Sequence, residues 1–148
     1  MDSALVINCD GGSRGNPGPA ASAFVAYRDG QEIFSQGKFL GVTTNNVAEY
    51  QAVILALEWL TENSSANFIL DSELVTRQLT GVYKIKNEIL RELSIRAKKI
   101  EKEKNLKINY QHVLREKNKK ADLLVNEALD KNLWSLPLEN GHFPVGEL

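Results

Sequence analysis

Residues 4–19 read ALVINCDGGSRGNPGP, and this stretch decides the fold class that the sequence adopts. Through Asp10 the side chains alternate, with Leu5, Ile7 and Cys9 on one side, which predicts a half-buried strand. The glycines and prolines that follow predict a turn. The sequence thus places a carboxylate, Asp10, at the carboxyl end of a buried strand.

The rest of the chain continues as strands and helices. Short turns separate the first three predicted strands, so we expect them to pair antiparallel. The expected strands are residues 4–10, 22–27, 32–40, 67–72 and 106–113, and the expected helices are 45–62, 72–80, 87–104 and 119–131. This order predicts an α/β fold with a five-stranded mixed sheet, three antiparallel N-terminal strands plus two parallel ones, flanked by helices.

Length and composition exclude several classes of protein. A chain of 148 residues corresponds to one domain, and 43% hydrophobic with 25% charged residues excludes disordered, collagenous and disulfide-scaffold chains. Cys9 is the single cysteine, so we expect a buried thiol and not a disulfide or a zinc site. No apolar run reaches membrane-spanning length and no leader pattern precedes the first strand, which predicts a cytoplasmic protein.

Charge is segregated along the chain. Residues 77–120 contain 14 of the 18 Lys and Arg residues but 5 of the 19 acidic residues, a net charge of +9, and the remainder carries −10. This pattern predicts a cationic surface for a phosphate backbone beside an acidic site for metal ions. Ordinary solvated helix surfaces are the alternative interpretation.

Four acidic residues are predicted to face inward. Asp10 and Asp71 each follow a buried strand, at the sheet edge where ligand sites form in α/β proteins. Glu49 and Asp122 each head an apolar stripe on a predicted helix. Clustered carboxylates repel one another unless cations are present, and oxygen ligands without His or Cys favour hard ions such as Mg²⁺. The four residues therefore predict a shared metal site.

Each acid also has an alternative explanation when it is taken alone. Asp71 could cap the helix that follows it, and Asp122 could complement the dipole of its own helix. Asp10 could brace the glycine turn. The shared metal site is preferred because it accounts for all four residues together.

Four segments of the sequence resemble, in order and spacing, the acidic motifs of type 1 ribonuclease H. They are DGGSRGNPGPA from residue 10, TTNNVAEYQA from residue 43, LDSELV from residue 70 and NKKADLLVNEAL from residue 118, and their acids are 39, 22 and 51 residues apart. The resemblance covers residues 4–131 and implies a ribonuclease H-like fold. It also implies an endonuclease that cuts the RNA strand of an RNA/DNA hybrid and leaves a 3'-hydroxyl and a 5'-phosphate. Asp10, Glu49, Asp71 and Asp122 would hold two Mg²⁺ ions, with Mn²⁺ as a substitute.

The resemblance also implies a set of substrate-binding residues: Gly11, Gly12, Asn16, Thr44, Asn45, Asn46, Asn87 and Arg115. The glycines let backbone approach nucleic acid closely, and the amides of Asn16, Asn45 and Asn46 suit the 2'-hydroxyls of the minor groove. Thr44 and Asn87 match a pocket for a DNA phosphate. Two alternatives stay open, in which Asn45 or Asn46 caps one helix and Asn87 caps the next.

Arg91, Lys98 and Lys102 fall at i, i+7 and i+11 of a predicted helix. This basic stripe suits a phosphate backbone, and a solvated helix face is the competing interpretation.

Three departures from the family pattern stand out. The basic, Trp-containing segment that some members carry after the second helix (the handle) is missing, which predicts weaker and more salt-sensitive hybrid binding. The family often has a histidine in the loop before the last aspartate. His112 lies instead in the predicted strand that precedes this loop, so we expect it to be a strand-face histidine. Arg115, in the loop, could then substitute for the family histidine electrostatically. Glu73 stands where a neutral glutamine is common.

Parts of the sequence are also compatible with two other functions. A noncatalytic nucleic-acid-binding module with the same fold would be favoured by loss of one of the four acids, and none is lost. A phosphate-binding protein that uses the glycine loop is disfavoured because a strand and not a helix follows the loop. The sequence therefore predicts a catalytic domain over residues 1–131 and an apolar tail over residues 132–148 that packs on it, in a monomer without an obligate protein partner or membrane contact.

Overall fold

A computed structural model of the chain describes residues 4–132. The predicted packing of the apolar tail concerns residues that, from position 133 onward, lie outside the described ones. The elements in chain order are β1 (Leu5–Ser13), β2 (Gly18–Arg28), β3 (Gln31–Thr43), α1 (Asn45–Trp59), β4 (Ser65–Leu70), α2 (Glu73–Leu79), α3 (Glu88–Glu103), β5 (Lys107–His112), the short 3₁₀ turn η1 (Arg115–Lys117) and α4 (Lys119–Asn132).

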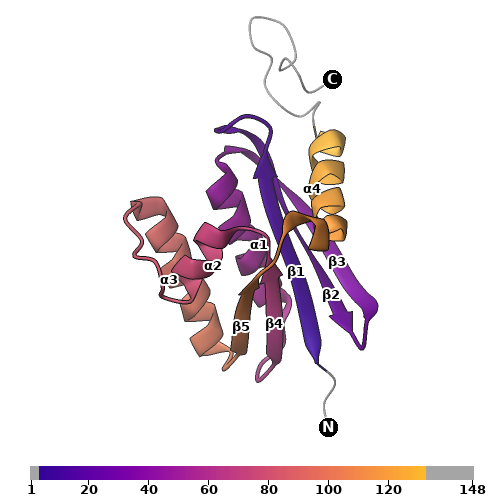
Figure 1. Ribbon diagram of the computed structural model, residues 1–148, viewed down its shortest axis with the longest axis vertical. Coiled ribbons are helices and arrows are strands. Elements are labelled where there is room, and N and C mark those ends of the chain that lie inside the picture. Colours follow the sequence, from indigo (N-terminus) through magenta and orange to yellow (C-terminus); the bar gives the residue numbers. More distant parts are fainter. Residues whose placement is uncertain (1–3, 133–148) are drawn as a thin grey trace, which may run out of the picture.

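The five strands form one mixed sheet in the order β3-β2-β1-β4-β5 (Figure 1). β1 pairs antiparallel with β2, and β2 with β3, whereas β4 runs parallel to both β1 and β5. The predicted five-stranded arrangement is confirmed. Because β1 and β4 are parallel neighbours, their carboxyl ends meet at one edge of the sheet.

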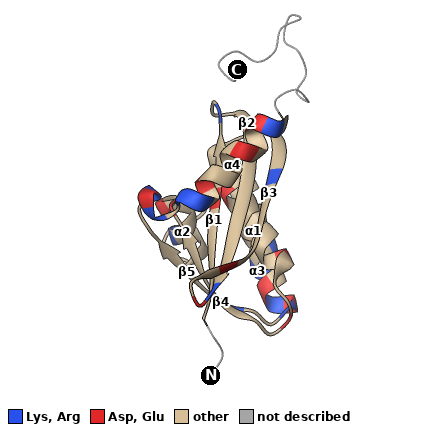
Figure 2. Cartoon of the chain, turned by 90° about the vertical axis from the view of Figure 1, so that its right-hand side faces the viewer, with Lys and Arg blue, Asp and Glu red and all other residues tan. Residues whose placement is uncertain are grey.

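Helices cover the two faces of the sheet unequally. Phe24 and Ala26 of β2 belong to a large core shared with α1, whereas Ala21 and Ala23 belong to a smaller core with α4. Side chains alternate across a strand, so these two cores lie on opposite faces. α4 contacts β1, β2 and β3, and α3 packs on α1 (Figures 1 and 2).

Several boundaries differ from the prediction, and β2 and β3 are both longer than expected. β1 continues through the predicted glycine turn to Ser13, because β2 pairs with it as far as Ala20. The first helix ends at Trp59 and not at residue 62, since Leu60 has ψ of 142° and leaves the helical conformation. The turn η1 was not predicted.

Among the described residues, no helix combines the length and the apolar character that crossing a membrane requires.

Candidate active site

The four predicted acids converge at the carboxyl ends of β1 and β4. The register pairs Cys9 with Leu70, so the next residues, Asp10 and Asp71, lie on neighbouring strands. Glu49 reaches the same point from α1. Asp10, Glu49 and Asp71 each offer a carboxylate oxygen within 4.8 Å of the other two. We call these three residues the carboxylate group.

Asp122 approaches the carboxylate group from the first turn of α4. It does not belong to the set of oxygens within 4.8 Å. Its negative charge nevertheless contributes to raising the pKa values of Asp10 and Asp71, which places it in their electrostatic environment. The structure therefore brings three of the predicted ligands into direct proximity and the fourth beside them.

The position of Glu49 depends on close packing between α1 and β1. A side chain at Gly11 would overlap the backbone of Ala48, so only glycine lets the helix approach this far. The backbone N–H of Gly11 donates to Oε1 of Glu49 at 3.2 Å, and the hydroxyl of Ser22 donates to the carbonyl of Ala48 at 2.6 Å. The predicted contact of Gly11 with nucleic acid stays a prediction, to which the structure adds this packing role.

Burial disfavours the ionised form of the three clustered carboxyl groups. Desolvation is the main cause that raises the pKa of Asp10 to about 7, and it raises the pKa of Glu49 well above its usual range. It also raises the pKa of Asp71, where the hydrogen bond from Asn118 and the charge of Arg115 act in the opposite direction. Negative charges on neighbouring carboxylates add to the shift in all three groups. A nearby positive charge would stabilise the ionised form of such a cluster.

The residues fit a divalent metal. Glu49 is 5% exposed, and its Oε2 atom is buried without a hydrogen-bond partner among the described residues. A set of oxygen donors without thiolate or imidazole favours a hard cation. The alternative in which Asp71 caps α2 was wrong, because Ser72 caps that helix, with its hydroxyl accepting from Val75. Asp122 does lie in the first turn of α4, where its charge also complements the helix dipole.

Two of the predicted substrate-binding asparagines join the β1–β2 hairpin to α1. The side-chain oxygen of Asn16 accepts from the backbone N–H of Asn45 at 3.0 Å, and the side-chain oxygen of Asn45 accepts from the N–H of Ser13 at 2.8 Å. Both acceptor atoms are thus occupied. In the described part of the chain their NH₂ groups have no partner, and so remain available as donors.

The alternatives for the helix caps are settled by Thr44 and Asn87. Thr44 caps α1 through its hydroxyl, which accepts from Val47, so the idea that Asn45 or Asn46 is the cap was wrong. Asn87 caps α3 by accepting from Leu90 at 3.0 Å, as its alternative predicted. Both caps use acceptor atoms, and a donor is left on each side chain for a phosphate.

Arg115 and His112 lie near Asp71. Arg115, in η1, and His112, at the end of β5, both lower the pKa of Asp71 by their charge. His112 is an exposed strand residue, as predicted. The expected electrostatic substitution by Arg115 is consistent with this position.

The basic stripe on α3 is partly engaged within the protein. Arg91 donates to the carbonyl oxygen of Ile85 at 3.3 Å, and Lys98 forms an ion pair with Glu101 at 3.3 Å. Blue and red segments alternate along α3 in Figure 2, so the helix is not uniformly basic. Binding of a phosphate backbone by this stripe stays a prediction.

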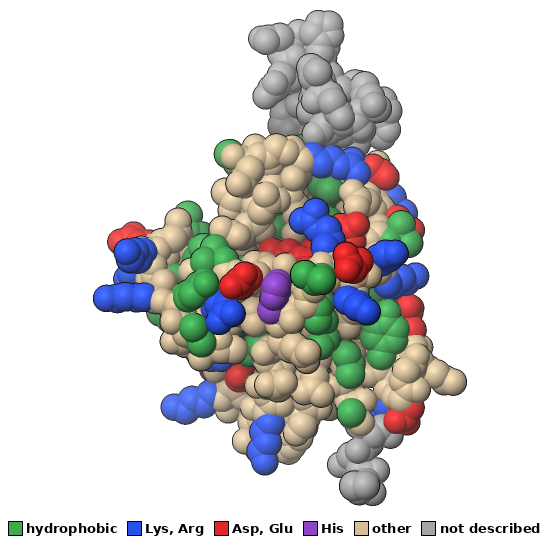
Figure 3. All heavy atoms as spheres, in the orientation of Figure 1, with side chains coloured by type: hydrophobic (Ala, Val, Ile, Leu, Met, Phe, Trp, Pro, Cys, Tyr) green, Lys and Arg blue, Asp and Glu red, His purple; other side chains and the backbone are tan. Residues whose placement is uncertain are grey.

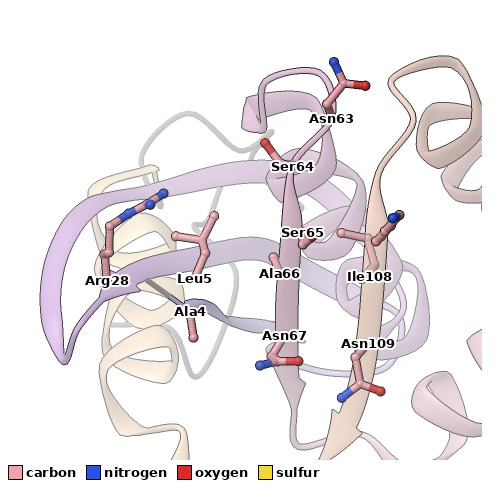
Figure 4. Close-up of a pocket in the computed structure, with 11 residues that line it drawn as sticks. Ala4, Leu5, Arg28, Asn63, Ser64, Ser65, Ala66, Asn67, Ile108 and Asn109 are labelled. Atoms are coloured by element: carbon pink, nitrogen blue, oxygen red, sulfur yellow. The ribbon is translucent and has the colours of Figure 1, made fainter. Parts of the chain in front are cut away.

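The acidic residues line a hollow of about 360 Å³, together with Gly12, Asn46 and Arg115. A larger hollow, of about 770 Å³, lies at the opposite end of the sheet, where β4 and β5 begin. Figure 4 shows its amides and hydroxyls, among them Asn67 and Asn109 on adjacent strands. It has no carboxylate in its lining and so does not offer the same chemistry.

Two side chains that the sequence did not single out also support the site. Asn118 is fully buried and donates to Oδ2 of Asp71 at 3.3 Å. Arg14, from the hairpin, forms an ion pair with Asp130 of α4 at 2.7 Å and donates to Asn126 at 3.3 Å. Their partners are distant in sequence, so no local pattern pointed to them.

Known proteins share the sequence pattern and the fold of this chain. A family model described as RNase H matches residues 2–130. The chain belongs to the RNase H family. Ribonuclease HI of Halobacterium salinarum is 42% identical over 124 residues, which cover 82% of this RNase H chain and 62% of the halobacterial protein.

Two further comparisons place this RNase H among its relatives. LC11-RNase H1, solved in complex with an RNA/DNA hybrid, superposes with a TM-score of 0.82 at 42% identity, covering 87% of this chain and 99% of that one. The bifunctional protein Rv2228c of Mycobacterium tuberculosis is 38% identical over 130 residues, 85% of this chain and 35% of the relative. The chain therefore spans about a third of the length of Rv2228c. The family predicted from the four acidic motifs is confirmed.

Proposed function

We propose that this chain is a metal-dependent endoribonuclease that hydrolyses the RNA strand of RNA/DNA hybrids and leaves 5'-phosphate and 3'-hydroxyl ends. The observation that carries the proposal is the carboxylate group, with Asp122 beside it, in a chain of the RNase H family. The complex of LC11-RNase H1 with an RNA/DNA hybrid supports the choice of substrate.

Two divalent cations are assigned to Asp10, Glu49, Asp71 and Asp122, with Mg²⁺ preferred and Mn²⁺ as a substitute. When bound, the two ions activate a water and stabilise the leaving 3'-oxygen in an in-line displacement. Among these acids, Asp10 contributes by giving up its proton when a cation binds. Because burial raises the pKa of Asp10 to about 7, its proton is held loosely enough near neutral pH to be exchanged for a cation.

The remaining residues orient the hybrid. Asn45 and Asn46 line the acidic hollow, and Asn16 is bonded to Asn45, so their amide groups are assigned to the 2'-hydroxyls of the hybrid. Thr44 and Asn87 keep donors for a phosphate of the DNA strand. Arg115 counters the negative charge that builds up when substrate phosphate meets the carboxylates.

Cleavage assays test this proposal. End-labelled RNA/DNA hybrid, double-stranded RNA, single-stranded RNA and duplex DNA are incubated side by side with Mg²⁺, Mn²⁺ or a chelator, for wild type and Asp10→Asn. We expect metal-dependent cutting of RNA in the hybrid alone. Asp10→Asn changes little volume, so it should lose turnover while hybrid binding stays within about threefold of wild type.

Retained cleavage by Asp10→Asn at ordinary Mg²⁺ concentrations would refute the metal assignment. Absence of cleavage by the wild type, with hybrid binding intact, would instead favour the noncatalytic binding module. The monomeric state and the cytoplasmic location stay predictions from the sequence, which size-exclusion chromatography with light scattering and cell fractionation test.

A further inference from the structure

Asn118 is a buried amide outside the carboxylate group whose contacts join three separate elements. Its Nδ2 donates to the carbonyl oxygen of Cys9 at 2.7 Å and to Oδ2 of Asp71 at 3.3 Å. The main-chain carbonyl oxygen of Asn118 accepts from the backbone N–H of Asp122 at 3.1 Å. One residue with 0% exposure thus contacts the end of β1, the acid that follows β4 and the first turn of α4.

Hydrogen-bond chemistry fixes the orientation of this amide. The Cys9 carbonyl and the Asp71 carboxylate are both acceptors, so the side chain must present its NH₂ group to them. The flipped orientation would place Oδ1 against two oxygens. As a result Oδ1 is buried without a partner among the described residues.

The orientation of Asn118 costs stability. An asparagine directly before a helix ordinarily accepts a hydrogen bond from the first turn through its side-chain oxygen. Asn118 holds that position before α4 but leaves Oδ1 unpaired, and a buried unpaired acceptor is unfavourable. The amide orientation that donates to Cys9 and Asp71 therefore differs from the orientation that would cap α4, and Asn118 adopts the first of the two.

We propose that Asn118 is a positioning residue that holds Asp10 and Asp71 in the arrangement that binds divalent cations, an inference that rests on the proposed function. The bond to Cys9 fixes the residue directly before Asp10. The bond to Asp71 directs one of its oxygens, and the bond from Asp122 fixes the start of α4. Removing the side-chain amide frees the strand end before Asp10 and the carboxylate of Asp71 at once, whereas the main-chain bond from Asp122 is kept in every Asn118 variant.

The experiment compares wild type, Asn118→Ala and Asn118→Asp. Thermal unfolding is followed during a Mg²⁺ titration without nucleic acid, and kcat and KM are measured on the hybrid at saturating Mg²⁺. In Asn118→Ala we expect the Mg²⁺ concentration for half of the maximal Tm shift to rise about 10- to 100-fold, and kcat to fall with little change in KM. Asn118→Asp keeps the volume but replaces the donor with a negative charge, so its kcat should be no higher than that of Asn118→Ala.

Tyr110→Phe is the matched control for losing a buried hydrogen bond, because its hydroxyl donates to Glu101 at 2.8 Å outside the carboxylate group. It should lower Tm without changing the Mg²⁺ titration. If Asn118→Ala behaves like Tyr110→Phe, or Asn118→Asp retains wild-type kcat and Mg²⁺ response, the inference is overturned. Should Asn118→Ala not fold, Asn118→Asp carries the test.

Failure of the proposed function is distinguishable from failure of this inference. If the wild type does not cleave the hybrid, the proposed function falls, and the Mg²⁺ titration of the variants still decides the role of Asn118.

Discussion

Burial of ionised acidic side chains is unfavourable, and in this site protons or cations compensate for it. Asp10 is 5% exposed, and its pKa is raised from 3.8 to about 7, mainly by desolvation. A carboxyl group with a higher pKa in the folded state binds more protons there than in the unfolded chain. Without metal, the contribution of Asp10 to stability must therefore fall as the pH rises from about 4 to 7.

Asp10→Asn should accordingly stabilise the metal-free protein at alkaline pH. We expect its free energy of unfolding at pH 8, in chelator, to exceed that of the wild type by roughly 1 to 3 kcal/mol, and the gain to vanish near pH 4. Urea unfolding at the two pH values measures this. Glu62→Gln, which changes an exposed acid, is the control and should leave the pH trend unchanged. A wild type that grows more stable from pH 4 to 8 in chelator would contradict the argument.

Gly11 and Gly12 are adjacent, yet only one of them is needed for packing. A Cβ on Gly11 would overlap the backbone of Ala48, whereas a Cβ on Gly12 would find its nearest neighbour, a Val125 methyl, at 3.9 Å. Gly11→Ala should cost about 1 to 3 kcal/mol of stability and move Glu49, and Gly12→Ala should cost under about 1 kcal/mol. Paired denaturation curves test this, and equal losses for the two variants would show that the contact between α1 and β1 adapts.

At the scale of the elements, the basic stripe on α3 runs from the carboxylate end of the molecule toward the opposite end. Asn87, whose side chain we assign to a phosphate, caps the start of α3. At the other end of the helix, the main-chain carbonyl of Lys104 accepts from the backbone N–H of Asn63. Asn63 lines the hollow at the end opposite the carboxylates. Arg91 is therefore at the end nearer the proposed hybrid, and Lys102 is at the far end.

Salt titrations should separate these two residues. Arg91→Ala is expected to lower hybrid affinity about 2- to 10-fold and to reduce the slope of log affinity against log salt by about one, because one phosphate contact is lost. Lys102→Ala should leave the slope unchanged. Fluorescence anisotropy in chelator measures binding without cleavage. The reverse ranking would mean that the hybrid runs along the whole of α3.

The elements themselves were largely predictable from sequence, whereas the residues that lock them together were not. Alternation located β1, and an apolar stripe predicted that Glu49 faces inward, because both are periodic local signals. Thr44 and not Asn45 became the cap of α1 because Asn45 is bonded to Ser13 in another element. Asn118 was missed for the same reason, since its partners Cys9 and Asp71 lie 109 and 47 residues away.

At the scale of the whole molecule, charge is arranged around the acidic hollow. Figure 3 shows Lys and Arg side chains on both sides of the recessed acidic patch. The segment 77–120 carries +9 although the chain as a whole carries −1. Attraction of a polyanion thus depends on one region of the surface and must overcome repulsion from the rest.

Only Thr80 to Lys86 separate α2 from the cap of α3, so the molecule has no room for the handle between these helices. With few phosphate contacts, hybrid affinity should fall about 10- to 100-fold between roughly 50 and 200 mM salt, while kcat at saturating hybrid stays nearly constant, since the ions screen binding and not the buried site. Binding by anisotropy and initial rates over the same salt series measure both quantities. A nearly flat affinity would show that neutral donors such as those of Asn16 and Asn45 dominate recognition. A parallel fall in kcat would show that the carboxylates are more open to solvent ions than the 5% exposure of Asp10 and Glu49 indicates.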